Sequence, residues 1–281
     1  MFAKMRMRAN IVNVFFFLLV LVGAFIAFVP LYWLVRSSLM SDTEIFIFPP
    51  KLFPDTFLWD NYYKAMTVVP FGKYFVNTFT IIIPVILGTV VTSSLAAYAF
   101  ARLKFPLKSL WFGLIISSML IPYVITLIPI FIAWTNLGMV NTYMPLILPA
   151  WLGGGAYNIF LLRQFMLSIP KDLDEAATID GAGPFRILFS IILPLVKPAL
   201  IAICLFTFMN TWNDLLGPVV YLNDGNKYTV AIGLSQFKGV YRTSWNMLMA
   251  ASVVVVSPAI LLFFLGQKQF VEGITITGMK A

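Results

Sequence analysis

IVNVFFFLLVLVGAFIAFVPLYWLV, residues 11–35, is an apolar run of 25 residues without a single charged side chain. A helix needs about 20 residues to cross the hydrocarbon core of a bilayer, so this run predicts a membrane-spanning helix. The basic residues Lys4, Arg6 and Arg8 precede it, as in a signal peptide. The run is too long for the apolar core of a signal peptide, so we expect an uncleaved first span.

The composition of the whole chain agrees with that first run. Hydrophobic residues make up 60% of the 281 residues and charged residues only 11%, whereas a soluble domain carries about 25% charged residues. The net charge of +8 comes from basic residues at the ends of apolar segments. That placement is a signal of membrane topology and argues against a nucleic-acid partner.

Six apolar segments are long enough to span, and we expect one all-α transmembrane domain over residues 1–281. The predicted spans are residues 11–35, 74–100, 110–134, 144–162, 199–222 and 246–266. The fourth is the shortest, and WLGGGA within it makes a regular helix least certain there.

Six spans place both termini on one side of the membrane. With the amino end inside, the inner segments hold twelve Lys and Arg residues and the outer segments seven. This bias predicts that both termini are cytoplasmic, together with the loop 163–198 and the tail 267–281. In the outer loop 36–73, Trp59, Tyr62, Tyr63 and Met66 indicate either a short amphipathic helix or an aromatic anchor at headgroup level.

The sequence lacks residues that several kinds of catalysis, metal binding and nucleotide binding require. There is no histidine and one cysteine, Cys204, so neither a Ser/His nucleophile pair nor a His-based metal site can form. VVPFGKY (residues 68–74) is the nearest approach to a nucleotide-binding G-x-x-x-x-G-K-[ST] loop, and it lacks the first Gly and the Ser/Thr. We therefore expect no enzyme, no metal and no ATP hydrolysis in this chain itself.

The cytoplasmic loop contains DLDEAATIDGAG (residues 172–183), where four of the eleven acidic residues fall within nine positions. Pro170 suits the first turn of a helix, and acids near its start meet the positive end of its dipole. Gly181 suits its end, and Pro184 suits the start of a second helix to about residue 193. A helix-turn-helix results, with Leu173, Ala176, Ala177 and Asp180 on one face. An ordinary amphipathic connector fits these residues as well.

The same loop carries the pattern Glu-Ala-Ala, three residues, Gly, nine residues, Ile-x-Leu-Pro. Its fixed positions are Glu175, Ala176, Ala177, Gly181, Ile191, Leu193 and Pro194. The pattern resembles the signature loop of membrane subunits in binding-protein-dependent ABC importers. NTYMPLILP (141–149), TWNDLLGPVVYL (211–222) and the tail QKQFVEGITITGMKA (267–281) resemble the maltose-type carbohydrate permeases, in particular the shorter of their two membrane subunits.

The resemblance implies a permease subunit that shares a translocation path with a second, homologous permease. It implies a separate ATPase dimer that binds ATP and Mg²⁺, an extracytoplasmic solute-binding protein, and a bacterial or archaeal cytoplasmic membrane. The coupling helix that docks on the ATPase would comprise Glu175, Ala176, Ala177, Asp180, Gly181 and Ala182. The tail would contact the ATPase through Gln267, Glu272 and Gly273. Related permeases carry disaccharides, longer oligosaccharides, polyols, uronate polymers and glycerol phosphate; we expect an oligosaccharide.

Polar residues inside the spans suggest where a carbohydrate would pass. The fifth span contains Asn210, Trp212, Asn213 and Asp214, and polar groups at that depth must face the bundle interior or water. Amides, carboxylates and a flat aromatic ring suit sugar hydroxyls and the apolar face of a pyranose. Tyr123 and Asn77 are weaker candidates. The alternative is structural, with Asn213 and Asp214 capping or joining helices.

Two other classes of membrane protein are alternatives to a permease subunit. A stand-alone ion-coupled carrier needs ionisable groups within its spans, and Asp214 is the one clear acid there. A membrane-embedded enzyme is disfavoured because histidine and paired intramembrane carboxylates are lacking.

Overall fold

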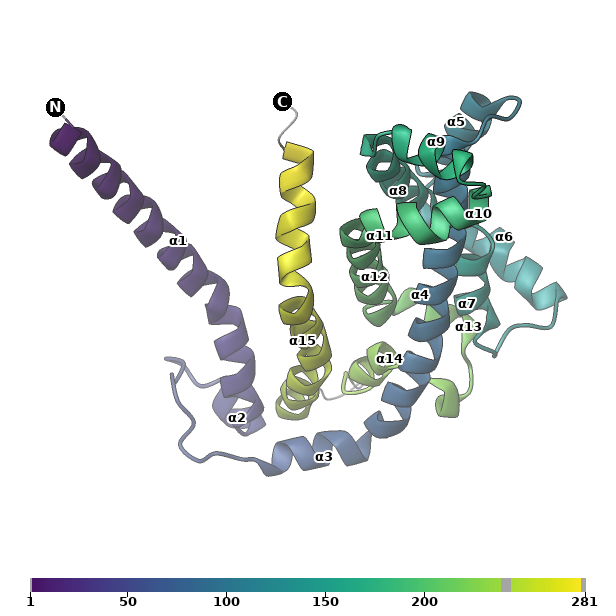
Figure 1. The fold of residues 1–281 in the computed structure, drawn as a ribbon. Coiled ribbons are helices and arrows are strands. Elements are labelled where there is room, and N and C mark those ends of the chain that lie inside the picture. The colour runs from purple at the N-terminus through teal and green to yellow at the C-terminus, as the bar shows by residue number, and fades with distance from the viewer. Residues whose placement is uncertain (1, 239–243, 279–281) are drawn as a thin grey trace. The chain divides into compact units, whose positions relative to one another are not determined.

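The computed structural model describes residues 2–238 and 244–278, with side chains for 13–238 and 244–267. Every secondary-structure element in these ranges is helical (Figure 1). The helices are α1 (Phe2–Ser38), α2 (Asp42–Ile45), α3 (Asp60–Val68), α4 (Phe71–Arg102), α5 (Lys108–Ser118), α6 (Tyr123–Asn136), α7 (Met144–Trp151), α8 (Ala156–Ser168), α9 (Asp172–Ile179), α10 (Pro184–Ile187), η1 (Leu188–Ile192), α11 (Leu193–Leu195), α12 (Lys197–Trp212), α13 (Leu216–Tyr221), η2 (Gly225–Lys227), α14 (Val230–Ser235) and α15 (Trp245–Gly278).

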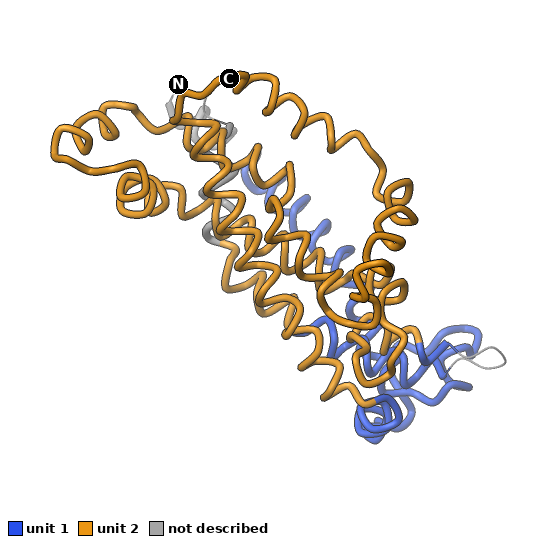
Figure 2. Tube along the Cα trace, turned by 90° about the vertical axis from the view of Figure 1, so that its right-hand side faces the viewer, with its two compact units in different colours: residues 1–69, 236–257 blue, residues 70–235, 258–281 orange. Residues whose placement is uncertain are grey.

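The chain divides into two compact units (Figure 2). Unit 1 holds residues 1–69 and 236–257, and unit 2 holds residues 70–235 and 258–281. We expected one transmembrane domain, and the division shows that its internal contacts form two groups. The α15 helix contributes to both, with Pro258 at the point where unit 2 resumes.

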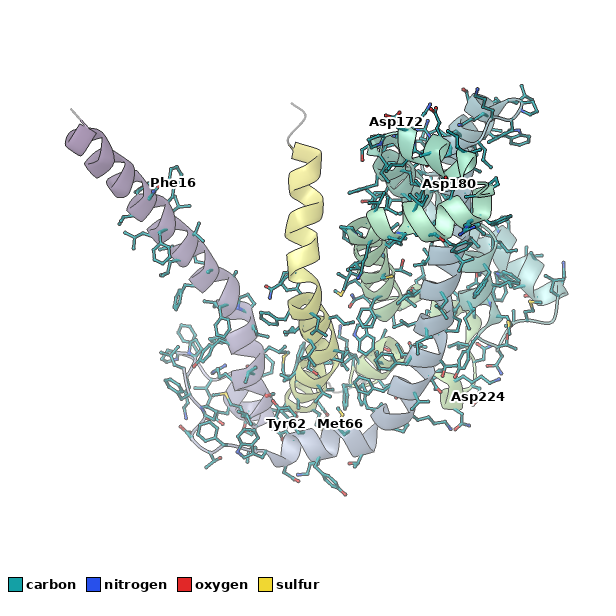
Figure 3. The ribbon with its side chains drawn as sticks, in the orientation of Figure 1. Phe16, Tyr62, Met66, Asp172, Asp180 and Asp224 are labelled. Atoms are coloured by element: carbon teal, nitrogen blue, oxygen red, sulfur yellow. The ribbon has the colours of Figure 1, made fainter. Side chains whose placement is uncertain are left out.

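Unit 1 is held together by polar contacts where α1 ends. The amide of Asn61 donates to the carbonyls of Ser38 and Met40, at 2.9 Å each. Asn246 of α15 donates to Asn61 Oδ1 and, through its backbone N–H, to Asp42. The predicted helix around Tyr62 and Met66 is α3, whose half-buried Tyr62 hydroxyl lies 2.7 Å from the Ser38 hydroxyl (Figure 3).

Unit 2 is built around α4, which packs against α7, α8 and α12. Small residues allow the close approach of α7 and the loop after it. A Cβ on Gly88 would lie 2.7 Å from the Trp151 ring, and one on Gly154 would lie 2.7 Å from the backbone nitrogen of Ser93. The Thr92 hydroxyl also donates to the Ala150 carbonyl at 3.0 Å. Over residues 88–93, α4 is therefore in close contact with α7 and with the loop after it.

Four segments in the described residues are candidate spans without a sharp bend: Asn13–Ser38, Phe71–Arg102, Met144–Ser168 and Trp245–Gln267. They correspond to the first, second, fourth and sixth predicted spans. The fourth runs to Ser168, six residues beyond the predicted end at 162, and the glycines divide it into α7 and α8. Gly154 and Gly155 there have φ angles of +63° and +84°, a region that favours glycine.

The third and fifth predicted spans differ from single helices. Residues 110–134 form α5 and α6, which meet at 98°, because Pro122 disfavours helical geometry in the residue before it. In the fifth, α12 ends at Trp212 and α13 begins only at Leu216, so residues 199–222 are two helices. A further bend of 80° separates α10–α11 from α12. The six-span count is reached if each bent pair counts as one span.

Candidate functional site

The first candidate site is the segment around α9. The helix begins at Asp172, with Asp172, Asp174 and Glu175 in its first turn, where the helix dipole favours negative charge. It ends because Gly181 adopts φ +79°; the Gly181 N–H bonds to the Thr178 carbonyl and the Ala182 N–H to the Ala177 carbonyl. These are the bonds of a glycine-terminated helix, and α10 then begins at Pro184.

The predicted coupling residues do not all face outward. Glu175, Ala176, Asp180 and Gly181 are exposed and Ala182 is half-buried, but Ala177 is buried in the core of unit 2. Its neighbours in that core include Ala101 of α4 and Leu162 and Met166 of α8. The two adjacent alanines therefore have different environments: Ala176 is open to a partner, and Ala177 packs α9 on its own chain.

Two apolar side chains that the sequence interpretation passed over are exposed beside these residues. Ile179 at the end of α9 is 86% exposed and Phe185 of α10 is 70% exposed. Large exposed apolar groups outside the predicted spans can belong to surfaces that bind partners or membrane. The available signal was the position of Ile179, three residues after Ala176 and so on its exposed face.

The second candidate site is a cavity of about 700 Å³ within unit 2. Side chains from α4, α6, α7, α12 and α13 and from the segment before α14 meet there. The lining residues are Thr78, Ile81, Tyr123, Leu146, Asn210, Thr211, Asp214, Pro218 and Thr229. Three residues predicted for a substrate path, Tyr123, Asn210 and Asp214, are brought together in this lining.

Asp214 has a structural task as well as a place in the cavity. Its Oδ1 accepts a hydrogen bond from the Gly217 N–H at 3.0 Å, at the start of α13. A Cβ on Gly217 would lie 2.5 Å from Asp214 Oδ2 and 3.0 Å from Leu146 Cδ2, so glycine is needed there. The carboxylate of Asp214 therefore both lines the cavity and accepts a hydrogen bond in the first turn of α13, between the end of α12 and the start of α13.

The other three predicted path residues lie elsewhere. Trp212 is buried and stacks on Phe208, with ring centroids 5.2 Å apart. The Asn77 amide donates to the carbonyls of Asn226 and Tyr228 at 2.9 Å each, which fixes the loop after α13. Asn213 is exposed, and its amide donates to the Met209 carbonyl at 2.8 Å. These groups satisfy partners in their own chain and stand outside the cavity lining.

The two candidate sites lie toward different ends of α4. Thr78 and Ile81, near its start, line the cavity, whereas Ala101, near its end, shares a core with Ala177 of α9. In Figure 3, Asp172 and Asp180 lie at one end of unit 2 and Asp224, in the loop after α13, at the other. For the predicted tail site, the exposed Gln267 is described and its amide donates to the Phe264 carbonyl. The backbone of α15 continues as a helix to Gly278, but the side-chain environments of Glu272 and Gly273 lie outside the described residues. Among the described side chains, no group of three Cys, Asp or Glu could hold a metal ion.

Several helices long and apolar enough to cross a membrane, beside a cavity lined by polar and apolar side chains, are the features of a polytopic membrane protein. Residues 85–276 match the family described as binding-protein-dependent transport system inner membrane component. The chain belongs to this family. The stand-alone ion-coupled carrier considered from the sequence is thereby excluded.

Relatives of similar length support the assignment. The sn-glycerol-3-phosphate transport system permease protein UgpE of Rhizobium meliloti is 34% identical, over 96% of this chain and 98% of its own. The diacetylchitobiose uptake system permease protein NgcG of Streptomyces coelicolor is 31% identical, over 92% of this chain and 85% of its own. A solved bacterial ABC transporter that imports the acidic polysaccharide alginate has the same fold, with a TM-score of 0.80, 22% identity, and coverage of 92% and 96%.

Proposed function

We propose that this chain is a permease subunit of an ATP-driven importer for a neutral oligosaccharide, in a bacterial or archaeal cytoplasmic membrane. With a second, homologous permease it would form the translocation path. Two ATPase subunits would bind ATP and Mg²⁺, and an extracytoplasmic protein would deliver the solute. The observation that carries the proposal is the polar cavity of unit 2 in a chain whose full-length relatives are solute permeases.

The ATPase would dock on α9 and the start of α10. Ala176 exposes only a methyl group, so another surface can approach the helix closely, while Ile179 and Phe185 offer apolar area to bury. The exposed carboxylates of Glu175 and Asp180 flank that area and can pair with basic groups on the partner. Gly181 sets the turn between the two helices, and the tail beyond Gln267 is proposed as a second contact.

The chemistry of the cavity favours a sugar. Thr211 and Tyr123 offer hydroxyl groups, and Asn210 offers an amide. The Thr78 hydroxyl is used within its own chain, where it donates to the Tyr74 carbonyl and accepts from the Val230 N–H. Hydroxyl and amide groups exchange hydrogen bonds with sugar hydroxyls without holding any one of them tightly. Weak, multiple contacts suit a path through which the solute must also leave.

The charge of the cavity favours a neutral sugar. Asp214 is the one carboxylate among the lining residues, and an ionised carboxylate accepts hydrogen bonds from hydroxyl groups but repels an anion. A glycerol phosphate or a uronate would bring a second negative charge to it. The diacetylchitobiose permease therefore fits this cavity better as a guide to the solute than the more numerous glycerol-phosphate relatives do.

Transport would proceed by alternating access. Closure of the ATPase dimer would move α9, and binding-protein docking outside would bias the same bundle toward its outward-open state. Each ligand can shift the equilibrium only by its difference in affinity for the two states. The chain itself would supply the path and the moving parts.

The test is uptake by the complex reconstituted in lipid vesicles with its binding protein. Labelled diacetylchitobiose and sn-glycerol 3-phosphate are compared, with and without ATP at the ATPase side. We expect ATP-dependent uptake of the neutral disaccharide and little of the phosphate. Uptake of the phosphate alone would overturn the neutral-sugar proposal, and uptake independent of ATP would overturn the importer proposal.

A further inference from the structure

Of the four acids clustered around α9, one is turned inward. Asp172, Glu175 and Asp180 are exposed, whereas the Asp174 side chain is only 18% exposed. Its Oδ2 lies 2.9 Å from Nε of Arg102, whose side chain is 4% exposed. Arg102 is the last residue of α4, so a buried ion pair joins α9 to the end of the helix around which unit 2 is built.

Arg102 also holds the chain just before α9. Its Nη2 donates a hydrogen bond to the Ile169 carbonyl at 2.9 Å. The Arg102 guanidinium therefore contacts both the segment that precedes α9 and the first turn of α9. A second arginine, Arg163 of α8, donates to the Phe100 carbonyl at 3.2 Å and lies over the Phe112 ring, which ties α8 to the same end of α4.

The energetics of the pair favour a positioning role over a stabilising one. Arg102 Nη1 and Asp174 Oδ1 are buried without a hydrogen-bond partner in the described residues, and the Nε contact is ionic without hydrogen-bond geometry. Removing two charges from water is costly, and a pair left partly unsatisfied recovers that cost poorly. Such a pair is weak evidence for stability, but it fixes one arrangement of α9 against α4.

The other end of α4 reaches the cavity. Thr78 and Ile81 of α4 are both cavity-lining residues. Residues 78 and 102 are 24 apart, so a helical rise of 1.5 Å per residue separates them by about 36 Å. The α4 helix packs closely against α7 at Gly88 and Thr92, between Arg102 and the cavity residues, so a packed helix connects the two places.

We propose that Arg102 is the positioning residue that links α9 to α4, so that movement of α9 reaches the cavity through the Arg102–Asp174 ion pair. The proposal rests on the proposed function, in which α9 receives the movement of an ATPase. Arg102 itself contacts neither solute nor ATPase in this scheme.

The test follows the access of a thiol reagent to the cavity, which does not require the solute to be known. Asn210→Cys is placed in a Cys204→Ala background, which removes the one native cysteine. In the assembled complex, labelling by a charged, membrane-impermeant methanethiosulfonate is compared without nucleotide and with ATP plus vanadate. ATP hydrolysis is measured on parallel samples of each variant, with ATP and without vanadate.

Three changes then test the link: Arg102→Gln, Asp174→Asn, and the exchange Arg102→Asp with Asp174→Arg. We expect ATP and vanadate to change the labelling rate about tenfold in the parent, a size typical of coupling between sites. Either single change should abolish that response while ATP hydrolysis continues, and the exchange should restore it. Loss of packing alone would not be repaired by exchanging the charges.

A matched control is Lys64→Gln on α3, where Lys64 and Asp60 form an exposed ion pair at 2.6 Å. Exposed pairs of this kind contribute little, so the response should remain. If the single changes at Arg102 and Asp174 keep the full response, or if the exchange fails to restore it, the proposal is wrong. If the parent shows no response to ATP and vanadate, the proposed function fails first.

Discussion

The helices α1 and α4 are both long and apolar, yet their surroundings are opposite. Residues 13–30 of α1 are all exposed, and their side chains are almost entirely apolar. The α4 helix buries Asn77, Thr78, Thr89, Ser93 and Ser94 along with its apolar residues. Polar residues inside a span need a protein partner, so α4 is an interior helix of unit 2. We expect residues 13–30 of α1 to face lipid.

Substitution of one glycine in each helix tests this difference between α1 and α4, and it should have the largest effect on the yield of folded complex. Gly88→Leu on α4 would drive a side chain into the Trp151 ring, and such overpacking costs roughly 1–3 kcal/mol or more. We expect the yield of folded complex in membranes to fall strongly. Gly23→Leu on α1 is the matched control, because a Cβ there meets nothing within 4 Å. Equal yields for both would contradict the contrast between the two helices.

The next effect concerns the turn after α9. Gly181→Val places a β-branched residue at φ +79°, which costs roughly 1–2 kcal/mol of backbone strain. Nothing lies within 4 Å of its Cβ, so strain and lost docking are the only causes. We expect transport and ATPase retention on membranes to fall together, and Gly181→Asn, which tolerates this region better, to fall less. If both activities survive Gly181→Val, the segment is not the coupling element.

A smaller effect is expected at the cavity. Asp214→Asn keeps an oxygen for the Gly217 N–H but removes the charge. Losing a charge-assisted hydrogen bond to the solute costs about 1.5–3 kcal/mol, which lowers neutral-sugar uptake roughly tenfold or more. Uptake rates of the reconstituted complex measure this. Asp214→Ala with unchanged uptake and unchanged complex yield would remove Asp214 from both of its roles.

The smallest effect belongs to α1. Phe16 is 59% exposed and lies near the start of the apolar stretch of α1 (Figure 3). Phe16→Ala removes area that faces lipid, and exposed substitutions away from packed features stay within about 0.5 kcal/mol. We expect the thermal stability of the purified complex to be unchanged. A clear drop would show that a protein partner covers this face of α1.

The contrast between these helices also explains what the sequence could predict. The first, second and sixth predicted spans are continuous helices, α1, α4 and α15. They could be predicted because a long apolar segment in a membrane must satisfy its backbone hydrogen bonds within a helix. The break near Asp214 escaped prediction because it accompanies a local hydrogen bond from the Gly217 N–H, which competes with the helix. The break near Pro122 had a signal in the sequence, because a proline disfavours helical geometry in the residue before it. The glycine-rich break near Gly154 had a clear signal and was expected.

The candidate site was partly predictable for a similar reason. The depth of Asn210 and Asp214 along their span could be counted, and both line the cavity. The position along the span does not predict the direction of the Trp212 and Asn77 side chains, because that direction depends on partners such as Phe208 and the Asn226 carbonyl. In α9, the pattern identified the segment, but only tertiary packing distinguishes buried Ala177 from exposed Ala176.

The measurement that tests the central claim most directly is retention of the ATPase by the chain in membranes. Ile179→Asp puts a charge at the centre of the proposed docking surface, and Ile47→Asp, at an exposed position in the loop after α2, is the matched control. The account predicts that the ATPase co-purifies with the wild-type chain and the control but is lost with Ile179→Asp. Equal retention by all three would contradict the claim that this chain receives its energy through α9.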